Sequence, residues 1–149
     1  MKNRLILVSF LISLLILAAY LLWPSNESRI RKLFNEGAKA LERKDLDTVM
    51  SKVSYNYQDE YGMTYLYLKE TLKREFANLS DITVECEDLK IQITDDTAIA
   101  ELKLRILATS GIETGYILGD IKTPLFLRFT LEKARSKWLI TKAEKFGGS

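Results

Sequence analysis

The chain has 149 residues, which suits one domain with a short appendage. Hydrophobic residues make up 47% and charged residues 28%, a composition that excludes a largely disordered chain. The formal charge is +2, and Lys2 and Arg4 account for it, so the neutral remainder disfavours a nucleic-acid-binding domain. One cysteine and no histidine exclude an internal disulfide and remove the commonest metal ligand, so we expect no metal and no cofactor.

An apolar run from Leu5 to Trp23 contains no charged residue. As a helix it would measure about 28 Å, at roughly 1.5 Å per residue, which is close to the hydrocarbon thickness of a bilayer. A cleaved signal peptide is the alternative, but Ala18-Ala19 is followed by further apolar residues and makes a poor cleavage site. The sequence therefore predicts an uncleaved signal anchor over residues 1–24 and one domain over residues 25–149.

The charges that flank this run bear on its orientation. Lys2 and Arg4 favour a cytoplasmic N-terminus, whereas Arg29, Arg31 and Lys32 on the other side oppose it. Retaining the short N-terminal flank in the cytoplasm is the simpler event. We therefore expect a single-pass membrane protein whose domain is extracytoplasmic, in the periplasm or the extracellular space.

Three helices are predicted after the anchor. Residues 26–44 carry apolar side chains at spacings of three and four, and Asn26 can cap this helix. Asp45 can cap a short second helix. Thr64 can cap a third helix, whose apolar positions follow a near-helical period. These positions are Leu68, Leu72, Phe76 and Leu79.

The hydrophobic period then changes to two, which is typical of strands with one covered face. The first strand starts its alternation at Ile82 and changes parity near Glu87-Asp88, as a β-bulge would require. Cys86 is in phase with the apolar positions and is expected to be buried. After a turn at Asp95-Asp96, the alternation of a second strand runs from Ala98 to Ala108.

The last part of the chain closes the predicted sheet. Residues 111–119 contain a glycine at every fourth position and are interpreted as a mobile hairpin loop. Strands around Leu125–Leu131 and Trp138–Ile140 then form a hairpin. Helices followed by a meander of strands predict an α+β fold, with three helices packed on a curved antiparallel sheet of four or more strands.

The order and lengths of these segments carry a resemblance. The segments are RIRKLFNEGAKALERKDLDTVMSKVS, YNYQDEYG, ITVECEDLKIQI, TAIAELKLRI and FLRFTLEKARSKWLITKAEKF. Together they resemble the nuclear transport factor 2-like, or cystatin-like cone, superfamily. The resemblance implies a curved sheet wrapped around helices, sometimes open enough to hold a ligand. Its members include isomerases, dehydratases, hydrolases, binding domains and assembly subunits, so the fold assigns no single function.

Tyrosines are concentrated between the second and third helices, within residues 55–67, together with Asp59 and Glu60. One interpretation is an aromatic pocket mouth with candidate ligand-binding residues Tyr55, Tyr57, Tyr61 and Tyr65. In an enzyme, the candidate catalytic residues would be Asp59, Glu60 and Tyr61. The alternative is that these rings close the wide end of the cone while their hydroxyls reach water.

The inward-facing strand positions hold apolar side chains and one thiol, but no carboxylate. Because a general acid or base must reach its substrate, this pattern disfavours an enzyme. We predict a membrane-tethered, non-catalytic binding or protein-interaction domain of the cell envelope. The alternative is a small-molecule isomerase, dehydratase or hydrolase with a cone pocket near Tyr55–Tyr67.

Three partners are expected. The first is the lipid bilayer, through Leu5–Trp23, and the second is an envelope protein. The third is a second copy of the chain, because apolar residues interrupt the outer sheet face and can support a homodimer. These residues are Ile99, Leu107, Phe126 and Leu139. No nucleic acid is expected.

Overall fold

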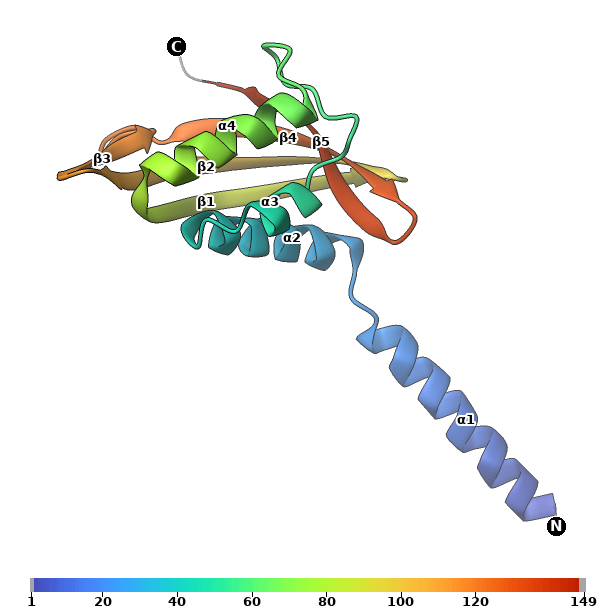
Figure 1. Ribbon diagram of the computed structural model, residues 1–149. Coiled ribbons are helices and arrows are strands. Elements are labelled where there is room, and N and C mark those ends of the chain that lie inside the picture. Colours follow the sequence, from blue (N-terminus) through green and yellow to red (C-terminus); the bar gives the residue numbers. More distant parts are fainter. Residues whose placement is uncertain (1, 148–149) are drawn as a thin grey trace.

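The computed structural model describes residues 2–147, with side-chain positions from residue 6 onward. Helix α1 extends away from the remaining elements, which form one layer of helices against one sheet (Figure 1). The helices are α1 (Lys2–Leu22), α2 (Asn26–Glu42), α3 (Leu46–Ser51) and α4 (Tyr65–Asn78). The strands are β1 (Ser80–Thr94), β2 (Thr97–Ser110), β3 (Glu113–Leu118), β4 (Leu125–Ala134) and β5 (Lys137–Lys145).

All strand pairs in the five-stranded sheet are antiparallel, in the order β1-β2-β4-β5. The N-terminal part of β2 pairs with β4 and its C-terminal part pairs with β3. The register between β1 and β2 shifts between Glu87 and Lys90, where Asp88 has a φ of 54°, so the predicted bulge is confirmed. The predicted α+β class and antiparallel sheet are confirmed as well.

The predicted hairpin at residues 111–119 is confirmed, but most of the segment is a strand rather than a loop, because Glu113–Leu118 forms β3 and pairs with β2. Gly111, with a φ of 63°, lies in a tight turn, and the Thr109 and Thr114 hydroxyls are 2.8 Å apart across the two strands. Gly119 has a φ of 69°, and a Cβ there would lie 3.0 Å from the Leu104 carbonyl oxygen. These glycines therefore serve a hairpin rather than a flexible tip.

Helix caps differ in two places from the prediction: at the start of α2, and at Thr64, which takes the N-cap position of α4 without a side-chain hydrogen bond. Ser25, not Asn26, caps α2, since its Oγ accepts a hydrogen bond of 3.1 Å from the Ser28 amide. The Asn26 side chain instead accepts a hydrogen bond of 3.3 Å from the Trp138 indole. Helix α2 also ends at Glu42, two residues earlier than expected. The predicted cap at Asp45 is confirmed, because its carboxylate accepts from the Thr48 amide.

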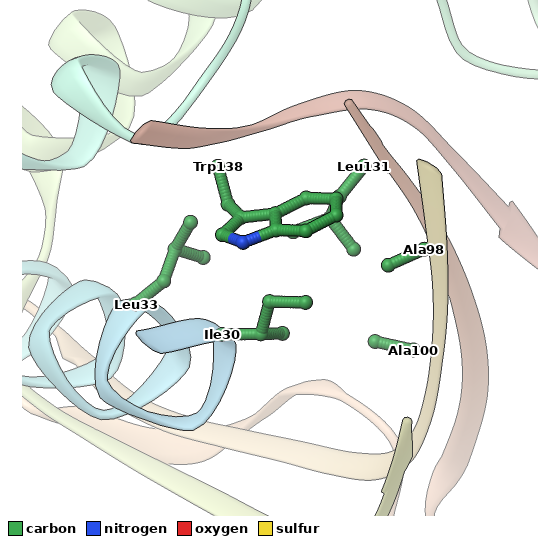
Figure 2. Packing of buried hydrophobic residues seen from close by; sticks show 6 residues of the cluster. All are labelled: Ile30, Leu33, Ala98, Ala100, Leu131 and Trp138. Carbon is green, nitrogen blue, oxygen red and sulfur yellow. The ribbon is translucent and has the colours of Figure 1, made fainter. Parts of the chain in front are cut away.

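The tightest part of the core lies where α2 meets β2, β4 and β5. Figure 2 shows the side chains of Ile30 and Leu33 pointing from α2 toward Trp138, Ala98 and Ala100. The two alanines on β2 are small enough to let the helix approach the sheet closely. A second cluster continues along β1 and β2 under α4, where larger aliphatic side chains follow. The concave face of the sheet is therefore apolar along its length.

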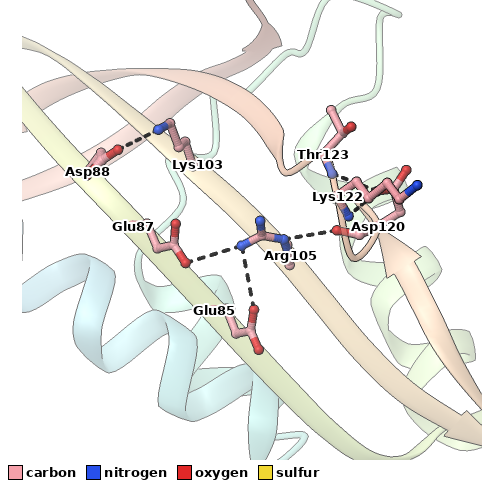
Figure 3. Close-up of polar contacts among 8 residues, drawn as sticks. All are labelled: Glu85, Glu87, Asp88, Lys103, Arg105, Asp120, Lys122 and Thr123. Carbon is pink, nitrogen blue, oxygen red and sulfur yellow. Dashed lines mark hydrogen bonds and ion pairs between the residues drawn. The ribbon is translucent and has the colours of Figure 1, made fainter.

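Ion pairs cover the opposite face of the sheet. Arg105 on β2 lies with its Nη1 atom 3.2 Å from Glu87 and 3.8 Å from Glu85, both on β1 (Figure 3). Lys103 contacts Asp88 at 2.6 Å, next to the bulge. These cross-strand pairs are only partly shielded from water, so each stabilises the sheet weakly. The predicted homodimer through this face stays a prediction.

Helix α1 contains the predicted membrane span. Among the described residues, no single helix has both the length and the apolar composition of a membrane span. Within the described part of the chain, the required length and apolar composition are reached only when two helices are taken together, Ile6–Leu22 and Asn26–Glu42. The axis bends by 48° between them. Lys2, Arg4 and Leu5, which the orientation and span predictions used, lie outside the residues whose side chains are described.

Truncation of Ile30, which is 0% exposed, should destabilise the domain strongly. The Ile30→Ala variant leaves a cavity between α2 and the sheet, and we expect a loss of about 2–5 kcal/mol in the free energy of unfolding. Leu66→Ala, on the surface of α4 and 72% exposed, should change it by less than about 0.5 kcal/mol. Urea unfolding of both variants measures the difference, and equal losses would refute this packing.

Candidate ligand-binding cavity

A cavity of about 300 Å³ lies between the helices and the concave face of the sheet, and it is open to the surface. Helix α2 and the sheet form most of its wall, while α3, the following connector and α4 complete it. The wall residues from the helices and the connector are Leu33, Phe34, Gly37, Ala38, Leu41, Val49, Lys52, Val53, Tyr57, Leu68 and Leu72. Those from the strands are Val84, Cys86, Leu102, Leu104, Ile106, Leu118, Phe129 and Ile140.

The cavity exists because α4 does not close tightly on the sheet. Leu68 and Leu72 of α4 face the cavity, yet none of the residues in this helix is fully buried. Thr64 precedes α4 without a side-chain capping hydrogen bond. On the opposite wall, Gly37 of α2 presents no side chain, and a Cβ placed there would meet no atom within 4 Å. Helix α4 and the part of α2 around Gly37 therefore leave space that side chains fill in a typical protein core.

The walls are almost entirely hydrocarbon. Among the residues that the structure describes, no Asp or Glu lines the cavity, and Lys52 is the charged residue in the wall. The Lys52 ammonium donates a hydrogen bond to Glu36 on α2, and this bond lowers the pKa of the Glu36 carboxyl. The charge of Lys52 is thus directed at Glu36, and its methylene stem contributes to the wall.

Tyr57 is the member of the tyrosine cluster that lines the cavity, and it is only 7% exposed. Backbone hydrogen bonds from Ser54 to Ile140 and from Gln58 to Thr141 tie its segment to β5. Burial, and then the Asp59 carboxylate, raises the pKa of Tyr57 to about 12. Its phenol is therefore neutral at physiological pH and cannot act as a general base.

The other tyrosines proposed as ligand-binding residues lie differently. Tyr55 is 85% exposed and Tyr61 is 75% exposed. The rings of Tyr55 and Tyr65 pack together with their centroids 4.7 Å apart. None of these three lines the cavity. Their assignment to ligand binding stays a prediction.

The candidate catalytic carboxylates make structural hydrogen bonds. Asp59 Oδ1 accepts from the backbone amides of Tyr61 at 2.8 Å and Met63 at 2.7 Å, so it holds the turn before α4. Glu60 accepts from the Lys145 amide at 3.2 Å and ties this turn to β5. Neither carboxylate lines the cavity. A catalytic role for Asp59, Glu60 and Tyr61 stays a prediction.

Cys86 is exposed, so its predicted burial is wrong. Its side chain faces inward as predicted, but it faces the open cavity rather than packed atoms. Its apolar surroundings, and then the Glu42 carboxylate, raise the pKa of the Cys86 thiol. The thiol is thus protonated at neutral pH and is a weak nucleophile.

Comparisons with known proteins identify the fold. No protein-family model matches the sequence. Curated protein sequences gave no match either. A Nostoc punctiforme protein of unknown function with a cystatin-like fold superposes with a TM-score of 0.63 at 14% identity, over 80% of this chain and 89% of that one. A candidate dehydratase of the nuclear transport factor 2-like family from Streptomyces avermitilis superposes with a TM-score of 0.66 at 12% identity, over 80% and 94%.

A third similar structure is the Bd1075 protein of Bdellovibrio bacteriovorus, with a TM-score of 0.62 at 13% identity. The match covers 80% of this chain but only 40% of the Bd1075 chain. At these identities the likeness shows the fold alone, which is cystatin-like and agrees with the resemblance in the sequence.

The pair of Glu36 and Lys52 should make stability depend on acid pH. Because the pKa of Glu36 is lowered from 4.5 in the folded chain, the stabilisation is complete above the unfolded pKa and is lost as the pH falls through the folded pKa. Glu36→Gln should therefore remove part of the stability loss seen below about pH 4.5. Urea unfolding at a series of pH values from 6 to 3 measures the free energy of unfolding of each variant. Glu70→Gln, at an exposed position of α4, is the control, and identical profiles for the two variants would refute the assignment.

Proposed function

We propose that the chain is a membrane-tethered, non-catalytic binding domain of the cell envelope, whose cavity holds an apolar ligand. The observation that supports this most is the open cavity of about 300 Å³ with hydrocarbon walls. Pockets for small ligands typically start at about this volume. The domain thus has room for a ligand but offers few groups that could react with one.

The energetics of the cavity favour an apolar occupant. Water in a hydrocarbon-walled cavity finds few hydrogen-bond partners, so displacing it costs little. An apolar ligand also gains roughly 25 cal/mol for each Å² of apolar surface removed from water. A polar group placed there would lose its hydrogen bonds to water, at a cost of about 1–3 kcal/mol. Affinity should therefore follow the apolar area of the ligand.

The membrane tether is part of the proposal. Helix α1 is 21 residues long and exposes apolar side chains on all sides, including Ile6 at 68%, Leu14 at 56% and Leu21 at 73%. A helix that is apolar all round favours an apolar environment. Although the described part of α1 is too short to pass as a span by itself, the predicted span from Leu5 to Trp23 would enter the bilayer in our proposal. Tyr20 and Trp23 suit the bilayer surface at its end. In our proposal the N-terminus is cytoplasmic and the domain is extracytoplasmic.

An enzyme is the second candidate, because the similar structures include a candidate dehydratase. Such a reaction needs a group that takes or gives a proton beside the substrate. Tyr57 faces the cavity, but its pKa of about 12 keeps the phenol protonated, so it cannot serve as a general base, and as an acid it would have no base beside it in the described wall. The carboxylates of Asp59 and Glu60 accept backbone hydrogen bonds outside the cavity. This geometry supports binding more than catalysis.

Filling the cavity should abolish binding without unfolding the domain. In Gly37→Leu, the new side chain enters open space, and replacing a helical glycine also favours the helix. We expect the affinity for an environment-sensitive apolar dye to fall at least about tenfold, because the side chain occupies part of the space that the dye needs. Fluorescence titration of the full chain measures this.

The matched control is Ala77→Leu, which adds a similar side chain to the exposed surface of α4. It should leave dye affinity unchanged. If both variants bind the dye as the wild type does, the cavity is not the binding site. Circular dichroism of Gly37→Leu shows whether the domain is still folded.

A further inference from the structure

The walls restrict which part of a ligand can enter. The residues in the wall that carry polar atoms in their side chains are Lys52, Tyr57 and Cys86. The Lys52 ammonium is hydrogen-bonded to Glu36, the Tyr57 phenol is neutral, and the Cys86 thiol is a weak hydrogen-bond donor. A charged group inside would find the Lys52 ammonium already paired, and among the described wall residues its polar atoms could reach the Tyr57 hydroxyl and the Cys86 thiol alone, neither of which carries a charge. Any such group of the ligand must therefore stay at the mouth.

The extent of the cavity restricts the shape of the ligand. Three successive inward positions of β2, Leu102, Leu104 and Ile106, line it, which requires about 13 Å along the strand. Leu118 on β3 pairs with Ile106. Ile140 on β5 lies opposite Leu131, which pairs with Ala98, so the wall extends over roughly 26 Å along β2. A cavity of about 300 Å³ with this extent is longer than a sphere of equal volume is wide. It therefore suits an extended chain better than a compact ring system.

The volume limits the length of such a chain. An apolar protein cavity of about 150 Å³ accommodates one benzene molecule. A cavity of about 300 Å³ therefore has room for on the order of a dozen carbon atoms. This is enough for one hydrocarbon chain of an amphiphile and too little for two.

We propose that the ligand is a single-chain amphiphile, whose hydrocarbon tail fills the cavity while its polar head stays outside. The proposal rests on the proposed function and names the ligand class of the same site. Recognition then depends on the length of the tail and hardly on the chemistry of the head. The tail then packs against Leu102, Leu104 and the other apolar residues of the wall.

The test uses the single cysteine as a reporter, because Cys86 lines the cavity and is accessible from outside. The full chain is kept in solution with a fluorinated surfactant, whose tails mix poorly with hydrocarbon chains. Straight-chain alcohols and carboxylates of about six to sixteen carbons are titrated, and the alkylation rate of Cys86 by N-ethylmaleimide is measured. At roughly 0.8 kcal/mol per methylene, each added carbon should raise the affinity about fourfold.

The rise of affinity with chain length should stop near a dozen carbons. The gain per added carbon should be the same for alcohols and carboxylates. In Gly37→Leu the rise should stop several carbons earlier, whereas Ala77→Leu should match the wild type. Fused-ring alcohols of equal carbon number should bind more weakly than chains. Rings that bind as tightly as chains, or an affinity that does not depend on chain length, would overturn the ligand class but leave apolar binding intact. If neither chains nor rings protect Cys86, the proposed function fails as well.

Discussion

The alternation of apolar and polar residues along β2, together with a change in the size of its inward side chains, determines the rest of the structure. At one end Ala98 and Ala100 let α2 approach the sheet, and Ile30, Leu131 and Trp138 pack there without space. Farther along, larger aliphatic side chains face α4, which lies over them without closing the gap. A tightly packed half thus holds the domain together, and the cavity forms beside it.

The sequence predicts most of the fold because the spacing of apolar residues indicates which segments are helices, which are strands and which face is covered. The parity change at Glu87-Asp88 located the bulge, and the period of two located the inward face of β2. The sequence predicted a hairpin at residues 111–119 but not the strand β3, since glycines at regular spacing have the same pattern in a mobile hairpin loop and in a paired strand. The sequence also could not show the cavity. Gly37 and Cys86 occupy inward positions of the hydrophobic period, and this is so whether the space beside them is filled by side chains or empty.

The candidate site illustrates how little a fold says about chemistry. Similar structures at 12–14% identity share the cone, but the composition of the wall decides what a cone can do. In this chain the acidic residues near the cavity make other contacts: Glu36 pairs with Lys52, and Asp59 accepts hydrogen bonds from the turn before α4. What faces the space is mainly hydrocarbon, and in our proposal such a wall selects a ligand by its apolar area and shape.

The central claim is that this space is open and apolar, and xenon tests it most directly, because xenon enters dry apolar cavities with little regard to chemistry. Methyl resonances of the full chain are recorded under increasing xenon pressure. We expect saturable shifts for Leu72, Leu102 and Ile106, which line the cavity, and none for Ile30 or Leu131 in the packed half. Unchanged resonances for Leu72, Leu102 and Ile106 would show that side chains fill the space, and would contradict this account of the protein.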